Sequence, residues 1–407
     1  MKRGNGTLSR LLCIAVQAIF LAGVLFSAGA IETYGTHNPV SGVCAAFAED
    51  GTLATGTLLN GELETKLYER DVMSATTQEA MMGFPFTGLS QGCEEAFSSD
   101  GKWLATVVPG SELVVVILDR TTKTVHRRFS MAWTQFHSTS TEPMYRSSFL
   151  GGFLEDDSLV LWRYVPYAVP DSTDASNANL HLQRWSLDGE LLSDNDLGWV
   201  GFGPTGRAPI ASARLNVIWI PSKCEEVFCF REVKTLAGRI EDGRTLRLPK
   251  DNSAEPASLP GDEGFLSVLG RTAQKAVLFD SSGQLMAQVG LPFFPNLLGP
   301  LVPDWFTDRK PQVSHDATVA AVGRTRIAWV LVDTDRDWGS EVVVLKLHPL
   351  AVLATLKTGK GGIRTVAIDH RDGFVRVVSF WDEQWHEMKC DDVHPRGCHW
   401  QRMPAKS

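Results

Sequence analysis

Basic residues are scarce in this 407-residue chain, which has 39 lysines and arginines against 47 aspartates and glutamates. The formal net charge is −8, and it becomes −8 − 3 = −11 without the first 30 residues, which carry Lys2, Arg3 and Arg10 and no acid. A protein that binds nucleic acid needs a basic face to neutralise phosphates. The acidic balance therefore argues against nucleic acid as a partner.

Three further absences narrow the class of protein. Beyond residue 30, the sequence has no apolar stretch long enough to cross a bilayer and no segment with helical periodicity. It has no Cys-x-x-Cys pair, and His399 is the only histidine beside a cysteine, so the usual zinc spacing is missing. With 43% hydrophobic residues, the chain still has enough apolar side chains for a large core. We predict an all-β globular chain without a cofactor.

Residues 1–30 have the pattern of a secretory signal peptide. The three basic residues flank the start of an apolar run, Leu11 to Phe26, interrupted only by Gln17, and Ala28-Gly29-Ala30 fits the cleavage pattern. An uncleaved anchor is the alternative, but a span needs about 20 apolar residues and this run is shorter. We therefore expect a secreted or periplasmic protein, with residues 31–405 forming its domain.

Six cysteines remain after the leader, and an even number in an oxidising compartment indicates disulfides. Six cysteines allow 15 pairings. The two pairs that are close in sequence flank probable turns, and the remaining two cysteines occupy equivalent places in adjacent repeats. The predicted pairs are Cys224–Cys229, Cys390–Cys398 and Cys44–Cys93.

The most informative feature is an internal repeat of an apolar residue, a tight Asp/Gly turn and an apolar pair. Phe47–Ala54 and Phe97–Ala105 show it most clearly. Asp and Gly tolerate the backbone angles of tight hairpin turns, so each repeat predicts a strand, a turn and a strand. The double step between the third and fourth anchors implies a degenerate unit near residue 212, where Ala211–Ile220 has a strand pattern, giving seven units. The anchors are Asp50, Asp100, Asp156, Asp262, Asp316 and Asp369.

Each unit also contains a second predicted hairpin, at Leu118–Val125, Trp185–Leu191, Ile240–Leu246 and Phe279–Leu285. Four strands per unit of about 50 residues is the blade of a β-propeller. The strings Phe97–Ala105 and Phe279–Leu285 resemble the WD40-like and YVTN-type propeller repeats of bacterial secreted proteins. That resemblance implies a single β-propeller of four-stranded blades and no particular function.

Seven blades fit the spacing, and six or eight are the alternatives. The sequence leaves the closure of the ring open. The last blade is completed by residues 384–405, by Ile31–Tyr34, or by both.

Insertions interrupt the repeat at 131–146, 166–179 and 292–311. The third is apolar and proline-rich. It either folds over the seam between blades 5 and 6 or presents an exposed patch to a protein partner. Its candidate partner-binding residues are Phe293, Phe294, Leu297, Leu298, Trp305 and Phe306.

Two motifs suggest chemistry but have a simpler explanation. Gly88–Gly92 matches the nucleophile elbow of serine hydrolases, but it precedes a repeat strand and no helix follows, so we expect a turn between blades. His386-Glu387 is half of a zinc-protease motif and lacks the second histidine.

Acidic residues around 333–341 could converge on one calcium ion, but they lie between two strong β runs, so an acidic hairpin turn is the simpler explanation. The candidate ligands are Asp333, Asp335, Asp337 and Glu341. His315, His348 and His370 each lie beside a turn, and we expect solvated side chains there rather than a cluster on the propeller axis. Tryptophans such as Trp103, Trp162, Trp219 and Trp329 are expected to pack between blades.

The sequence therefore predicts a non-enzymatic propeller that binds a protein, a peptide or a glycan, and we expect a monomer. The alternative is a propeller hydrolase, a lactonase or a glycan-cleaving enzyme, with its site at the axial mouth. Three or more convergent His, Asp or Glu side chains at that mouth would favour the enzyme.

Overall fold

The computed structural model contains thirty strands and no α-helix among the residues that it describes. These are residues 43–403 apart from 60–61, 70–71, 81–97, 99, 110–112, 132–134, 137–145, 148, 155–156, 167–177, 199–209, 213–216, 223–227, 237–238, 249–255, 261–263, 271–273, 293–303, 309–310, 329–339, 359–361 and 392–397. The predicted leader and the Gly88–Gly92 motif lie outside this part of the chain.

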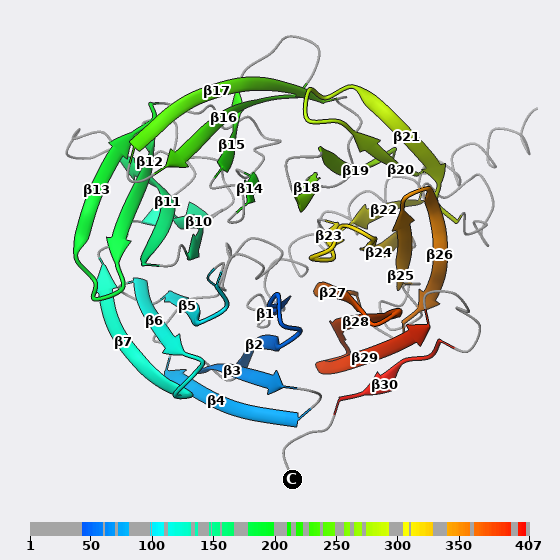
Figure 1. The fold of residues 1–407 in the computed structure, drawn as a ribbon, viewed down its shortest axis with the longest axis horizontal. Coiled ribbons are helices and arrows are strands. Elements are labelled where there is room, and N and C mark those ends of the chain that lie inside the picture. Colours follow the sequence, from blue (N-terminus) through cyan, green and yellow to red (C-terminus); the bar gives the residue numbers. More distant parts are fainter. Residues whose placement is uncertain are drawn as a thin grey trace, which may run out of the picture.

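Seven antiparallel sheets follow one another along the chain and stand around a common centre (Figure 1). Strands pair with their neighbours in chain order, as hairpin connections require, except that β22 and β23 of blade 6 both pair with β24. Blade 1 contains β1 (Val43–Phe47), β2 (Leu53–Leu59), β3 (Glu62–Glu69) and β4 (Val72–Ala80). Blade 2 contains β5 (Trp103–Pro109), β6 (Leu113–Asp119) and β7 (Thr124–Met131). Blade 3 contains β10 (Phe149–Leu154), β11 (Ser158–Pro166), β12 (Ala178–Ser186) and β13 (Leu191–Asp196).

The remaining four sheets continue the ring. Blade 4 contains β14 (Ile210–Ser212), β15 (Val217–Ser222), β16 (Phe228–Leu236) and β17 (Arg239–Leu248). Blade 5 contains β18 (Ala257–Ser258), β19 (Phe265–Leu269), β20 (Lys275–Phe279) and β21 (Leu285–Gly290). Blade 6 contains β22 (Asp304–Asp308), β23 (Gln312–Val313), β24 (Val319–Ala328), β25 (Ser340–Leu347) and β26 (Leu350–Lys357). Blade 7 contains β27 (Thr365–Arg371), β28 (Phe374–Trp381), β29 (Gln384–Asp391) and β30 (Gln401–Arg402).

The predicted seven-bladed β-propeller is therefore confirmed, including the degenerate fourth unit. One detail there differs, because the sequence pattern over Ala211–Ile220 suggested one strand and the structure has two, β14 and β15, which pair with Ala211 opposite Ile218. A short additional hairpin of β8 (Gln135–Phe136) and β9 (Arg146–Ser147) lies in the insertion between blades 2 and 3.

The Asp/Gly turns between the first two strands form as the repeat predicted. In blade 2, Asp100 Oδ1 accepts hydrogen bonds from the Lys102 amide at 2.9 Å and the Ser98 hydroxyl at 2.6 Å, and Gly101 has a φ of 68°. Blade 6 repeats this arrangement around Asp316, but Ala317 occupies the left-handed position with a φ of 55°. A side chain at positive φ costs free energy that glycine avoids.

We expect Ala317→Gly to raise the free energy of unfolding by about 0.5 kcal/mol, because relief of the left-handed strain exceeds the lost methyl contacts and added chain entropy. Gly101→Ala is the matched variant and should lower it by roughly 1–2 kcal/mol. Urea unfolding of both proteins measures the difference. Two changes of the same sign would contradict this account of the turn.

The predicted hairpin over Ile240–Leu246 is wrong. These residues lie inside the single strand β17, which pairs with β16 so that Leu236 faces Arg239. The strand register shifts between Arg231 and Val233, which marks a β-bulge, and the Glu232 carboxylate accepts a hydrogen bond from the Arg244 amide at 3.1 Å. A Cβ on Gly243 would lie 2.3 Å from Glu232 Oε2. Gly243 therefore admits a buried carboxylate rather than a turn.

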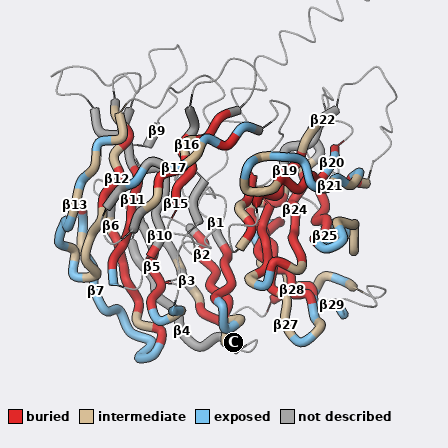
Figure 2. Tube along the Cα trace, turned by 45° about the horizontal axis from the view of Figure 1, so that its top comes forward, coloured by how far each residue is buried: buried red, intermediate tan, exposed pale blue. Residues whose placement is uncertain are grey.

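The core consists of layers between adjacent blades, and buried residues line the inner strands of the ring (Figure 2). Trp219 of blade 4 packs edge-on against Phe265 of blade 5 with ring centroids 5.1 Å apart. Trp103 and Trp162 are also buried, which agrees with their predicted packing role. Trp329 lies outside the described residues.

The ring closes by side-chain packing of blade 7 on blade 1. β29 and β30 complete blade 7, so residues 384–402 supply its two outer strands, while Ile31–Tyr34 lie outside the described part of the chain. Trp385 Nε1 donates a hydrogen bond to Thr57 Oγ1 at 2.8 Å across the seam. The apolar part of the seam consists of Ala45, Phe47, Leu53, Tyr68, Ala367, Val378 and Met403.

Candidate functional site

The innermost strands of blades 6, 7 and 1 bring charged side chains together at one end of the ring. His370 Nδ1 lies 2.6 Å from Asp316 Oδ2, which joins blade 7 to blade 6. His315 Nε2 lies 2.7 Å from the Phe47 carbonyl oxygen, which joins blade 6 to blade 1. We call His315, Asp316, His370 and Arg371 the axial cluster. His315 and Asp316 lie in the turn after β23, and His370 and Arg371 are the last two residues of β27; both strands are near the centre of the ring (Figure 1).

Asp316 is the most heavily hydrogen-bonded member of this cluster. Partial burial opposes its ionisation, but hydrogen bonds from Ser314, His370 and Thr318 outweigh burial and lower the pKa of Asp316 to about 2. A carboxylate with such a low pKa is a weak base at neutral pH. Its geometry therefore favours a structural contact between blades.

Arg371 connects the axial cluster to the closing seam. Its Nη2 donates to the Ala48 carbonyl at 3.3 Å, and its Nε donates to Asp369 Oδ2 at 3.0 Å. Burial raises the pKa of Asp369, against the attraction of Arg371 and Arg376. The charges at the seam thus face opposite charges within the protein.

A second charged contact joins blades 2 and 1 in the same way. Arg120 Nη2 donates to Asp50 Oδ2 at 2.7 Å and to Thr52 Oγ1 at 2.6 Å, and its Nη1 donates to the Gly101 carbonyl. The side chain of Arg120 is 8% exposed. The repeated Asp of the first turn therefore both shapes the turn and anchors a neighbouring blade.

The axial cluster contains two histidines and an aspartate. It therefore has the three His, Asp or Glu side chains that would favour an enzyme site. Each is bonded to another member or to backbone, and no group of three His, Cys, Asp or Glu side chains among the described residues could hold a metal ion. Sequence reasoning expected solvated turns here. That expectation holds for the exposed His348 and is wrong for His370, whose side chain is 13% exposed and paired.

We expect the Asp316→Asn variant to be less stable than the natural protein at pH 6, and the difference to shrink as the pH falls from 4 to 2. The folded pKa of about 2 lies below the ordinary 3.8, so the stability from the ionised carboxylate is complete above pH 3.8 and is lost as the pH falls through 2. Melting temperatures across this range measure the difference. Asp188→Asn is the control, because Asp188 is 76% exposed and 3.9 Å from His126. A pH-independent difference for Asp316→Asn would contradict the role of this carboxylate.

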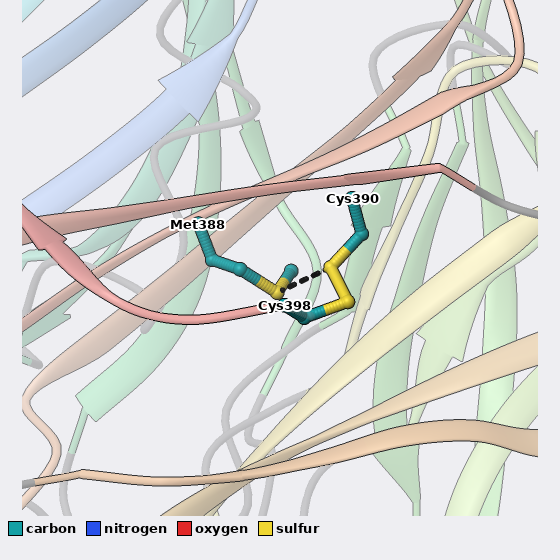
Figure 3. Close-up of a disulfide and its surroundings, with 3 residues drawn as sticks. All are labelled: Met388, Cys390 and Cys398. Atoms are coloured by element: carbon teal, nitrogen blue, oxygen red, sulfur yellow. Dashed lines mark hydrogen bonds between the residues drawn. A yellow bond between two sulfur atoms is a disulfide. The ribbon is translucent and has the colours of Figure 1, made fainter. Parts of the chain in front are cut away.

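One predicted disulfide is present. Cys390 and Cys398 are bonded with Cα atoms 5.3 Å apart, and Met388 Sδ lies 3.0 Å from Cys390 Sγ (Figure 3). Cys229 is also disulfide-bonded. Its predicted partner Cys224 lies outside the described residues, as does Cys93, and the side chain of Cys44 is not described, so those two pairings stay predictions.

The calcium hypothesis concerns residues that are mostly outside the described chain, namely Asp333, Asp335 and Asp337. The fourth candidate, Glu341, is fully buried, and its Oε1 lies 2.6 Å from Arg324 Nη1. An arginine therefore occupies the oxygen that a cation would need.

His386 and Glu387 are neighbours on β29 and so point to opposite faces of the sheet. His386 stacks on Trp381 with ring centroids 3.7 Å apart, and Glu387 accepts a hydrogen bond from Arg376. Burial lowers the pKa of His386. Both contacts join β29 to β28, so the pair is used in packing within blade 7.

The candidate partner-binding residues fall in two places. Phe293, Phe294, Leu297 and Leu298 lie outside the described residues, whereas Trp305 and Phe306 lie in β22, which pairs with β24. Part of the insertion predicted as a loop is therefore a strand at the inner side of blade 6.

Sequence reasoning missed the buried group around Arg324. Arg324 Nε donates to Gln274 Oε1 at 2.7 Å and its Nη1 donates to the Pro292 carbonyl at 3.0 Å, so it links blades 5 and 6. The available signal was a single arginine inside the apolar start of β24.

The described residues contain no helix that is long and apolar enough to cross a membrane. No family model matches the chain, and no curated protein matches its sequence. Among solved structures, the chain is similar to the β-propeller domain of Myceliophteria thermophila Cps50 (Swd1), with 9% identity and a TM-score of 0.45. The match covers 84% of this chain and 93% of that domain. The class that the seven sheets define is the β-propeller.

Proposed function

We propose that this chain is a secreted or periplasmic β-propeller that binds a partner protein without catalysis. The proposed contact is the connector between blades 5 and 6. Peptides and glycans are the two other ligand classes that such a scaffold could bind. The leader pattern and the Cys390–Cys398 disulfide support an oxidising compartment.

The observation that carries the proposal is that the connector is fixed at its base. Leu291 is buried in the core between blades 5 and 6, and its amide donates to the Gln274 carbonyl at 2.9 Å. Arg324 then holds the Pro292 carbonyl. These bonds attach the start of the connector to the propeller wall.

The far end of the connector is attached as well. Asp304 opposes Ala328 and Phe306 opposes Arg326 in the pairing of β22 with β24. An apolar segment held at both ends by a rigid scaffold suits protein recognition, because it loses less conformational entropy on binding than a segment with a free end. The residues proposed to contact the partner are Phe293, Phe294, Leu297, Leu298, Trp305 and Phe306.

A photo-crosslinking amino acid at Phe294 tests the proposal in the secreting cell. We expect a discrete adduct with one protein, and no adduct when the same amino acid replaces Leu192, which is 54% exposed on blade 3. A variant without residues 293–302 should keep its melting temperature. A missing adduct together with a lower melting temperature of the deletion variant would show a self-packed connector and overturn the proposal.

The axial cluster is the one observation that favours a hydrolase instead. If it served catalysis, the purified protein would cleave lactones or glycosides, and His370→Gln would remove that activity while the ring stayed folded. A screen of both substrate classes, with and without a chelator, separates the two functions.

A further inference from the structure

The outermost strand of blade 5 is unusual among the outer strands of the ring. Among the described strands, β21 hydrogen-bonds only to β20, so its other edge faces no described strand. Leu285 is 53% exposed and Met286 is 60% exposed. No charged residue occurs from Ser281 to Pro303, although 21% of the chain is charged.

Other outer strands carry the charges that normally keep sheet edges apart. Arg127 and Arg128 are exposed on β7, and Asp194 and Asp196 are exposed on β13. Like charges on an edge oppose the approach of a second strand. β13 begins with the exposed pair Leu191 and Leu192, so it matches β21 in apolar exposure and differs in charge.

The inner face of β21 is already used. Ala287 and Val289 are partly buried and pack against the blade 5 and 6 core together with Leu350 and Val352 of β26. Met286, Gln288 and Gly290 are exposed on the opposite face. The strand is therefore held in place while its edge and outer face stay accessible.

From these observations we propose that two copies of this chain associate through their β21 edges, forming one continuous antiparallel sheet across a two-fold axis. With the axis at Gln288, this residue faces its own copy, Met286 faces Gly290 of the second copy and Ala287 faces Val289, so each pair shares one face of the sheet. No like charges meet. The same pairing of β7 about Arg128 would place Arg128 opposite its own copy, and two like charges directly opposite each other are unfavourable.

Charge also favours the β21 edge over the other surfaces of the ring as the contact between two copies. Two chains of net charge −8 repel each other, so an uncharged edge is where identical copies approach at the lowest electrostatic cost. The contact involves a six-residue strand, which is small for a stable dimer, so we expect a dissociation constant on the order of 10–100 µM. This association differs from the monomer expected from the sequence and does not depend on the proposed partner site.

Sedimentation velocity of the purified protein from about 2 to 200 µM brackets that constant. We expect a reversible dimer, and we expect Met286→Lys to weaken it at least tenfold. Leu192→Lys is the control, because it adds the same charge to a similarly exposed apolar position on β13, and it should change nothing. A natural protein that stays monomeric throughout, or a dimer weakened equally by both variants, would overturn the proposal.

Cysteine crosslinking tests the strand register independently. Gln288 lies on the two-fold axis opposite its own copy, so Gln288→Cys should form a disulfide-linked dimer that a reductant separates, whereas Ser193→Cys on β13 should not. A dimer in sedimentation without this crosslink would place the contact elsewhere and refute the β21 edge.

Discussion

Replacing Gly264 by alanine is expected to lower the free energy of unfolding by about 3–5 kcal/mol, among the largest effects of any single methyl group in this chain. Gly264 immediately precedes β19 and has a φ of 139°, a conformation that L residues rarely adopt. A Cβ there would lie 1.9 Å from the Phe279 carbonyl oxygen and 2.9 Å from the Asp280 Cα. Both atoms belong to backbone that is held in the blade, so relief requires the sheet to move.

Two glycines separate the contributions of strain and overlap. Gly198 has a φ of 79° and nothing within 4 Å of an added Cβ, so Gly198→Ala should cost only about 1–2 kcal/mol. Gly290 has ordinary backbone and an open surrounding, so Gly290→Ala should be neutral or slightly stabilising. Urea midpoints at unchanged slope rank the three variants. Equal losses for Gly264→Ala and Gly198→Ala would show that the overlap contributes nothing.

Local chemistry made much of the fold predictable. The Asp/Gly turns could be read from the sequence because their bonds connect residues two apart, as from Lys102 to Asp100. The same reasoning failed at Asp242-Gly243, because glycine also serves where a distant carboxylate, that of Glu232, approaches the backbone. A residue type that meets two structural needs does not reveal which need is present.

The candidate site was less predictable than the fold because its bonds join distant residues. His370 meets Asp316 across 54 positions because blades 6 and 7 pack side by side, and His315 meets Phe47 across 268 positions only because the ring closes. The repeat did show that these residues occupy equivalent turns. It could not show that they would bond to one another rather than face solvent.

Replacing Arg324 by methionine is expected to cost about 3–5 kcal/mol at neutral pH, because three buried acceptors lose their donor. The Arg324 side chain is 1% exposed and donates to Glu341, Gln274 and Pro292. Methionine fills a similar volume without any donor, so the loss reflects unsatisfied polar groups more than a cavity. Chemical unfolding measures the change.

The cost of this substitution should also depend on pH. Burial raises the pKa of Glu341 to about 7, against the attraction of Arg324 and Lys357. In the natural protein, the protonated Glu341 therefore contributes its full stability below pH 4.5, the ordinary pKa. This contribution is lost as the pH rises through 7. Without Arg324 the carboxyl keeps its proton to higher pH. The difference between the two proteins should be constant from pH 5 to 7 and then widen by up to about 1.4 kcal/mol per pH unit.

Two further variants make this prediction specific. Arg324→Met combined with Glu341→Met removes both charges, so the widening above pH 7 should disappear and much of the stability should return. Lys123→Met is the surface control, since the Lys123 side chain is 42% exposed and pairs at 3.1 Å with Glu69, and its cost should stay below about 1 kcal/mol at every pH. If the cost of Arg324→Met stays the same from pH 5 to 9, Glu341 is not the group that responds. If the double variant is no more stable than the single one, the buried charge is not the source of the loss.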